Sequence, residues 1–194
     1  SKGEICLVTG PSGSGKTTLM RTISTSLTPL RGEIIYENFY KKYNEEEIFY
    51  IRQDPHIIPS TLNENLILDD VENYSKINNI SLGDLEDKQM NLLLSFGFTE
   101  DRLKELKLSK SINIEISGGE AQRIAILRIL FSNKVKLCLF DEPTSSLDKE
   151  NVLLIAQLIK TLAEDKICIV VTHDDYFKEL IRESTVKFID LGDR

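Results

Sequence analysis

Short, continuously apolar segments alternate along this chain with longer segments in which apolar residues recur every three or four positions. Residues 5–8 and 137–140 are apolar throughout, as expected of strands in a parallel sheet that is covered on both faces. The apolar positions of residues 149–163 fall on one helical stripe, made of Val152, Ile155, Ile159 and Leu162. Such a stripe suits packing on a sheet. The pattern therefore predicts an α/β fold.

The same periodicities place the remaining elements. Helices are expected at residues 16–27, 82–96, 100–106, 118–132, 149–163 and 176–182. Strands are expected at residues 5–9, 32–36, 47–51, 136–140, 166–172 and 186–190. A polar, helical stretch interrupts the alternation of strands and helices, and we predict a catalytic core of residues 1–60 and 117–194 with a helical subdomain at 61–116.

Composition narrows the class of protein. The 194 residues are 41% hydrophobic and 28% charged, which is typical of a globular domain. A net charge of −7 argues against a nucleic-acid partner, because such surfaces need clustered Lys and Arg. No apolar run is long enough to span a bilayer, so we expect this chain to be soluble by itself. It opens on Ser1 rather than Met, and we expect it to be part of a longer polypeptide.

The clearest chemical motif follows the first strand. It is the run Gly10, Pro11, Ser12, Gly13, Ser14, Gly15, Lys16, Thr17 and Thr18. This run fits the G-x-x-x-x-G-K-[ST] phosphate-binding loop, in which glycines let successive N–H groups point at one anion. Lys16 supplies a charge for the outer phosphates and Thr17 offers a hydroxyl to Mg²⁺. A plain Gly/Ser connection is the alternative, but the flanking strand and helix favour a nucleoside triphosphate site.

Two carboxylates end the apolar strand at residues 136–140. Asp141 and Glu142 would lie at the carboxyl end of that strand, beside the phosphate loop, where an Asp can hold Mg²⁺. Glu142 would then be placed to orient or deprotonate an attacking water. A solvated or helix-capping acidic pair is the alternative.

A second glycine-containing turn lies at Ser117, Gly118, Gly119 and Glu120. Ser117 and Glu120 fit an S-x-x-E capping box for the following helix. A cap does not need two adjacent glycines, and glycines at a helix start expose N–H groups to a close anion. The turn therefore predicts a cap and a second phosphate contact, which are compatible.

Together these motifs resemble the nucleotide-binding domain of the ATP-binding-cassette (ABC) ATPases. The Ser-Gly-Gly-Glu turn resembles the family's signature motif, and Asp141 and Glu142 resemble its Walker B end. Gln53 resembles the Q-loop glutamine, Asp148 the D-loop aspartate and His173 the switch histidine. Each of these last three alone would fit a structural role, as a loop amide, a helix N-cap or a strand-end residue. Their order along the chain supports the resemblance.

The resemblance implies a P-loop NTPase core with a mostly parallel sheet, a small antiparallel β subdomain and a helical subdomain insertion. It implies ATP and Mg²⁺ as ligands, with Thr17, Gln53 and Asp141 serving the metal. It also implies that Glu142 is the base, that His173 contacts the γ-phosphate, and that Gln53 links Mg²⁺ and water to the helical insertion.

The resemblance further implies an ATP-dependent, head-to-tail dimer with a second copy or a second ABC ATPase domain. Ser117, Gly118 and Gly119 of that second copy would contact the γ-phosphate, and Asp148 would reach across the interface. Phosphoryl transfer depends mainly on positioning and charge neutralisation, so a lone chain would hold half a site.

The segment after Gln53 suggests which branch of the family is involved. Residues 61–66, Thr-Leu-Asn-Glu-Asn-Leu, resemble exporters, which predicts ATP-driven transport through transmembrane domains of the same polypeptide. We then expect a location at the cytoplasmic face of the inner membrane. A non-transport ABC ATPase and a nucleotide-binding regulatory module are the alternatives.

One family feature is missing from this sequence. ABC domains carry an aromatic residue upstream of the phosphate loop that stacks on adenine, and none of the nine residues before Gly10 is aromatic. We expect the aromatic cluster Tyr36, Phe39, Tyr40 and Tyr43 to pack or pair in the small antiparallel hairpin instead. We therefore expect weak ATP binding and an exposed strand edge in that subdomain.

Overall fold

The computed structural model describes residues 4–36, 45–67, 70–109, 111–112, 116–182 and 185–192. It divides the chain into two compact units. The first unit comprises Ser1–Gln53 and Lys134–Arg194, and the second comprises Asp54–Asn133. The helical subdomain that the sequence predicts, residues 61–116, is shorter at both ends than the second unit. That division into a catalytic core and a helical subdomain stays a prediction.

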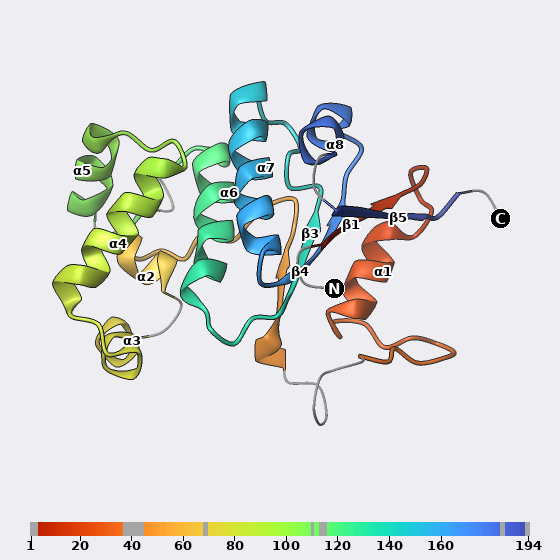
Figure 1. Cartoon of the computed structure of the whole chain (residues 1–194), viewed down its shortest axis with the longest axis horizontal. Coiled ribbons are helices and arrows are strands. Elements are labelled where there is room, and N and C mark those ends of the chain that lie inside the picture. The colour runs from red at the N-terminus through yellow and green to blue at the C-terminus, as the bar shows by residue number, and fades with distance from the viewer. Residues whose placement is uncertain are drawn as a thin grey trace. The chain divides into compact units, whose positions relative to one another are not determined.

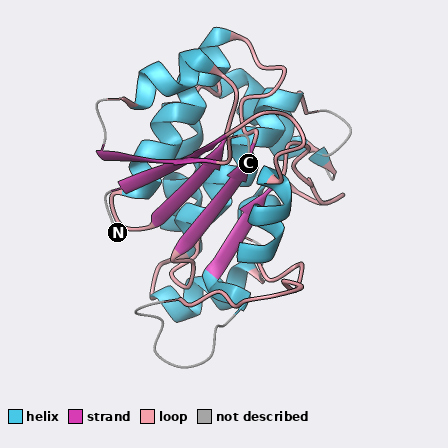
Figure 2. Cartoon of the chain, turned by 90° about the vertical axis from the view of Figure 1, so that its right-hand side faces the viewer, coloured by secondary structure: helices cyan, strands magenta, loops and turns pink. Residues whose placement is uncertain are grey.

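The first unit is built on a five-stranded sheet. Its strands are β1 (Glu4–Thr9), β2 (Ile48–Ile51), β3 (Leu137–Asp141), β4 (Ile167–Val171) and β5 (Thr185–Asp190). Their order across the sheet is β2-β3-β4-β1-β5, and each neighbouring pair is parallel (Figure 2). The predicted parallel sheet is confirmed. Its strands all end at one edge, where the functional side chains are attached.

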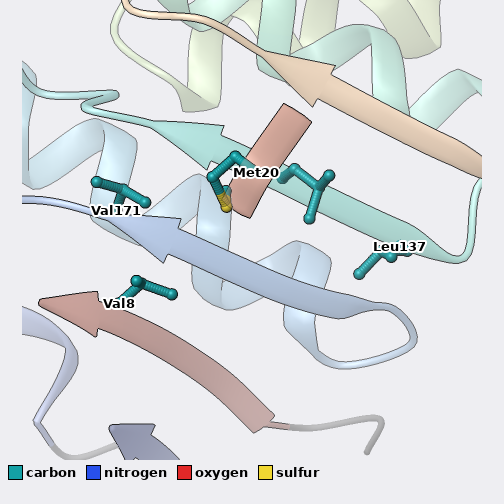
Figure 3. Packing of buried hydrophobic residues seen from close by; sticks show 5 residues of the cluster. Val8, Met20, Leu137 and Val171 are labelled. Carbon is teal, nitrogen blue, oxygen red and sulfur yellow. The ribbon is translucent and has the colours of Figure 1, made fainter. Parts of the chain in front are cut away.

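Helices cover both faces of this sheet. The first unit contains α1 (Lys16–Ile23), α7 (Lys149–Ala163), α8 (Asp175–Ile181) and a 3₁₀ turn at Glu45–Glu47. On one face, Met20 of α1 is fully buried against a cluster of strand residues, namely Val8, Leu137, Leu139 and Val171 (Figure 3). The α7 helix lies on the opposite face (Figure 1), and its predicted apolar stripe is buried. This packing fixes the start of α1 next to the ends of β1 and β3.

The prediction of an antiparallel hairpin between residues 32 and 51 is not met. Residues 33–36 form no strand, and β2 pairs with β3 in parallel instead. Ile35 is 73% exposed and Leu30 fully exposed, and Tyr36 packs against the core without forming a strand. A two-stranded hairpin that leaves its apolar residues exposed is marginal. The described residues contain no antiparallel strand pair. Residues 37–44, with Phe39, Tyr40 and Tyr43, lie outside the described residues.

The second unit is helical. It contains α2 (Leu62–Leu66), α3 (Val71–Asn78), α4 (Leu82–Ser95), α5 (Glu100–Leu108) and α6 (Gly118–Leu127), followed by a 3₁₀ turn at Arg128–Phe131. Each α-helix begins at a side chain that accepts a backbone N–H three residues on; these caps are Thr61, Asp70, Ser81, Thr99 and Ser117. The periodicity missed α3, although Asp70 as N-cap and Asn79 in a left-handed C-cap mark its ends. In the described ranges, no helix has the length and apolar character needed to cross a bilayer.

Candidate functional site

The loop between β1 and α1 is shaped by glycines at positions that other residues would strain. Gly10 has a φ of 143°, and a Cβ there would lie 2.8 Å from the Ser14 hydroxyl oxygen and 3.1 Å from the Leu191 carbonyl oxygen. Gly15, with a φ of 94°, is the N-cap of α1 and supplies no side chain to the first N–H groups of the helix. No acidic residue lies in the first turn of α1. The N-terminal dipole of this helix is therefore open to an anion.

Lys16 brings the positive charge to this loop. Its side chain is nearly buried, at 7% exposed, and Nζ donates hydrogen bonds of 2.8 Å to the carbonyl oxygens of Gly10 and Pro11. Both acceptors are neutral, so these bonds position the ammonium group without cancelling its charge. A buried cation held in this way is prepared for an anionic ligand.

The loop opens on a cavity of about 580 Å³. The cavity is bordered by Ser12, Gly13, Gly15, Lys16, Thr17, Thr18, Gln53, Asp141, Glu142, Ser145, Val171 and His173. Pro11 and Ser14 border a neighbouring cavity on the other side of the loop, next to β5. The first unit thus gathers the predicted residues of the phosphate loop, the acidic strand end, Gln53 and His173 around one space. The lining of this cavity thus includes one cation, Lys16, and two carboxylates, Asp141 and Glu142.

Asp141 is the last residue of β3 and is 7% exposed. Its Oδ1 accepts a hydrogen bond of 3.4 Å from the Thr17 hydroxyl, and its Oδ2 accepts one of 2.9 Å from the Tyr50 hydroxyl. Burial raises the pKa of Tyr50 to about 12, and the bond to Asp141 adds to this rise against the opposing effect of Arg21. Both oxygens of the carboxylate are therefore held by hydroxyl donors.

The donor set fits a magnesium ion that is held jointly with a nucleotide. Thr17, Gln53 and Asp141 offer a hydroxyl, an amide and a carboxylate, and Mg²⁺ prefers such oxygen ligands. In the part of the chain that the structure describes, no group of three or more His, Cys, Asp and Glu side chains could hold a metal alone. Mg²⁺ commonly relies on one or two carboxylates plus the phosphates of a substrate. In this structure the Gln53 amide nitrogen donates to the Ser145 hydroxyl at 2.8 Å.

Glu142 and His173 face each other across the ends of β3 and β4. Glu142 has a φ of 53°, a left-handed conformation that costs free energy in a residue with a side chain. The conformation is held because the Glu142 N–H donates to the Val171 carbonyl at 2.9 Å. The backbone N–H of His173 donates to Glu142 Oε2 at 3.2 Å, and the imidazole Nε2 lies 3.5 Å from Oε1. The two side chains are thus fixed together at the cavity.

The predicted turn at residues 117–119 belongs to the second unit. The capping box is present: the Glu120 N–H donates to the Ser117 hydroxyl, and the Ser117 N–H donates to the Glu120 carboxylate at 2.8 Å. Arg102 of α5 contacts both oxygens of that carboxylate, at 2.8 and 3.2 Å. Burial raises the pKa of Glu120, but the bonds from Arg102 and Ser117 outweigh burial and leave it below its ordinary value. Ser117 and Gly118 remain exposed.

Asp148 has a local partner in this structure. It is the N-cap of α7, and its Oδ1 accepts from the Asn151 N–H at 2.9 Å. The cap that the sequence suggested as the alternative role is therefore present. Asp148 is exposed and does not border the cavity, so a contact across a dimer interface stays a prediction.

Comparisons with known proteins agree with this geometry. A family model described as "ABC transporter" matches residues 1–145. The chain belongs to the ABC transporter family. It is the nucleotide-binding, ATP-hydrolysing domain of that family, for which Mg²⁺ is the usual cation.

Relatives of this ABC domain serve several transport systems. The chain is 35% identical over 185 residues to a lipoprotein-releasing system ATP-binding protein, LolD, of Buchnera aphidicola, covering 90% of this chain and 76% of that protein. It is 33% identical over 204 residues to the L-cystine import ATP-binding protein TcyC of Bacillus subtilis, covering 98% and 77%. A solved dimer of the ATP-binding cassette MJ0796, in a post-hydrolysis state with ADP and Pi, has a TM-score of 0.69 at 27% identity, covering 98% and 83%.

Two residues of the ABC site were not anticipated. Tyr50 and Ser145 contact Asp141 and Gln53, respectively. The sequence places Tyr50 only within the strand predicted at residues 47–51, and it singles out no role for Ser145. No local pattern marks either contact, because the partners are 91 and 92 positions apart.

Proposed function

We propose that this ABC domain binds the ATP phosphates at the start of α1 and hydrolyses ATP with Glu142 as the base. The observation that carries the proposal is the cavity that joins the open N-terminus of α1, Lys16, Asp141 and Glu142. The open amides and Lys16 would hold the β- and γ-phosphates, because they combine a helix dipole with a point charge.

The carboxylates would divide the work on the other side. Thr17, Asp141 and Gln53 would hold Mg²⁺, which when bound supplies charge neutralisation for the phosphate oxygens. Glu142 would orient the attacking water and accept its proton. His173 would fix the Glu142 carboxylate and contact the γ-phosphate. The backbone N–H of His173 already donates to Glu142, so the base is oriented before a nucleotide binds.

A second copy, or a second ABC domain, would complete the site. The loop and carboxylates of one chain would surround the phosphates incompletely. Ser117 and Gly118 are exposed, and Gly118 is unobstructed for a partner's nucleotide, whereas Gly119 is buried and would offer its backbone N–H. Ser117 accepts a bond from Glu120, which leaves its own hydroxyl proton to donate to a phosphate oxygen. Asp148 would reach across the same interface. The dimeric state of MJ0796 supports this arrangement.

Hydrolysis by this domain would drive transport through transmembrane domains, and the domain would act at the cytoplasmic face of the membrane. The relatives named for import and for lipoprotein release support transport as the output. They include both directions, so the exporter assignment stays a prediction. The weak ATP binding expected from the absent aromatic residue also stays one.

The decisive experiment is Glu142→Gln with ATP turnover and binding measured separately. Loss of general-base catalysis typically costs about 10²–10⁴-fold in rate, so turnover should fall by about that factor while ATP affinity is retained. In size-exclusion chromatography with ATP, the variant should accumulate a dimer. Glu164→Gln is the matched control, because Glu164 is an exposed residue of the first unit at the end of α7.

The dependence on protein concentration tests the shared site. Turnover per chain should rise with concentration in the unchanged protein, because two copies are needed for each site. A constant turnover per chain over a hundredfold range, or full turnover by Glu142→Gln, would contradict the proposal.

A further inference from the structure

The hydroxyl of Tyr50 has an unusual partner for a strand residue that packs in a core. Tyr50 lies in β2, half-buried, with its ring against the cluster of Val8, Met20, Leu137, Leu139 and Val171. Packing accounts for the ring but not for the hydroxyl. That group donates a 2.9 Å hydrogen bond to Asp141 Oδ2 at the end of the neighbouring strand.

Register explains how the two residues meet. The β2 and β3 strands are parallel, with Tyr50 opposite Leu139 and Ile51 opposite Phe140, so Tyr50 lies two positions before the level of Asp141. A tyrosine side chain is long enough to span this offset, whereas a phenylalanine would fill the same space without reaching the carboxylate. The hydroxyl is therefore the part of the residue that serves Asp141.

The direction of the bond follows from the two groups that form it. A carboxylate oxygen accepts and a phenol hydroxyl donates, so the Tyr50 proton points at Asp141 Oδ2. An O–H bond to a carboxylate is among the stronger hydrogen bonds in proteins.

We propose that Tyr50 is a positioning residue that fixes the rotation of the Asp141 carboxylate for Mg²⁺. By holding Oδ2, Tyr50 keeps Oδ1 directed towards the Thr17 hydroxyl, 3.4 Å away. The metal site then meets an oriented oxygen and does not have to order a free carboxylate. This inference rests on the proposed assignment of Asp141 and Thr17 to Mg²⁺.

The test measures how much Mg²⁺ strengthens nucleotide binding. The Kd of a non-hydrolysable ATP analogue is measured with excess Mg²⁺ and again with EDTA. The ratio of the Kd in EDTA to the Kd in Mg²⁺ reports the metal's contribution to nucleotide binding. Removing an outer-shell partner of a metal ligand typically costs about 10–100-fold in metal affinity. Tyr50→Phe should therefore lower this ratio by about tenfold or more, towards 1, while the Kd in EDTA stays unchanged.

Tyr36→Phe is the matched control. Tyr36 packs against the same apolar cluster, and its hydroxyl donates at 2.6 Å to the Ile23 carbonyl oxygen, a backbone group. This variant should keep the ratio of the unchanged chain. A purely structural role for Tyr50 would make the two variants alike. Replacing Tyr50 by 4-aminophenylalanine, which restores a donor on the ring, should raise the ratio again.

The outcomes separate this inference from the proposed function. An unchanged ratio in Tyr50→Phe, alongside a clear Mg²⁺ effect in the unchanged chain, would overturn the positioning role alone. An unchanged chain that gains nothing from Mg²⁺ would instead contradict the metal site itself. The Kd in EDTA also reports folding, because it depends on the phosphate loop of the same unit. If Tyr50→Phe loses that binding, the 4-aminophenylalanine variant decides. A ratio of about 1 in that variant would count against the proposal.

Discussion

The helices α1 and α6 both begin at glycine-containing turns, but their N-termini are prepared in opposite ways. The first turn of α1 contains no acid, and its N-cap, Gly15, offers no side chain. The N-cap of α6 is Ser117, which forms a complete capping box with Glu120. Arg102 then pairs with the Glu120 carboxylate. The start of α1 is left unsatisfied, and the start of α6 is satisfied from within.

This difference means that the two helix starts would recognise a phosphate group in different ways. Unsatisfied N–H groups and a helix dipole attract a phosphate before any partner arrives, and Lys16 adds a full charge to them. At α6 the Glu120 charge opposes an anion and is balanced by Arg102, so that end contributes shape and a hydroxyl proton rather than charge. We therefore expect a single chain to bind nucleotide through α1 alone, with α6 contributing only in a pair.

Among the variants that test this difference, Lys16→Ala should have the largest effect, which is on ATP affinity. A charge-assisted hydrogen bond contributes about 1.5–3 kcal/mol, which corresponds to about 10- to 150-fold weaker ATP binding. Lys149→Ala is the matched control, because Lys149 is also the first residue of a helix, but its helix is capped by Asp148. Calorimetric titration with ATP should leave the Lys149 variant unchanged. Equal losses in both variants would mean that helix position, not the open cap, governs affinity.

Ser117→Ala should have an intermediate effect, of two kinds. Loss of an N-cap costs about 1 kcal/mol of unfolding free energy, measured by urea denaturation. Ser81→Ala, which removes the cap of α4, should cost about the same. Only Ser117→Ala should also reduce the rise of turnover with protein concentration, while ATP binding by the dilute chain is retained. If Ser81→Ala reduced that rise equally, the effect would belong to helix stability.

The smallest effect concerns acid. Because the pKa of Glu120 is below its ordinary value in the folded chain, its ion pair with Arg102 stabilises fully above about pH 4.5 and less as the pH falls through the folded pKa. The Glu120 side chain is 12% exposed, so we expect Arg102→Met to cost about 1 kcal/mol at pH 7. Unfolding free energies measured between pH 3 and 7 should show this cost shrinking at the acidic end. A cost that is independent of pH would assign it to packing of the Arg102 side chain instead.

The N-cap at Ser117 illustrates what could be predicted from the sequence. A capping box depends on two residues three positions apart, and Asp148 caps α7 over the same span. The phosphate loop is equally local, since its glycines, Lys16 and Thr17 all lie within nine positions. Continuous apolar runs sufficed for the parallel strands, because burial on both faces leaves that mark in the sequence. The strand predicted at residues 32–36 is absent, because Tyr36 packs against the core as a single side chain while Ile35 stays exposed to solvent.

Contacts between distant segments were decided by the tertiary structure alone. The sequence determined that β3 ends in Asp141, but the register of β2 against β3 determined that Tyr50 reaches it. In the same way, packing brings the Gln53 amide to Ser145. Local periodicity records which side of an element is buried and carries no information on which element lies beside it. The sequence therefore determined the chemistry of each functional group, and the tertiary structure alone determined which partner that group contacts.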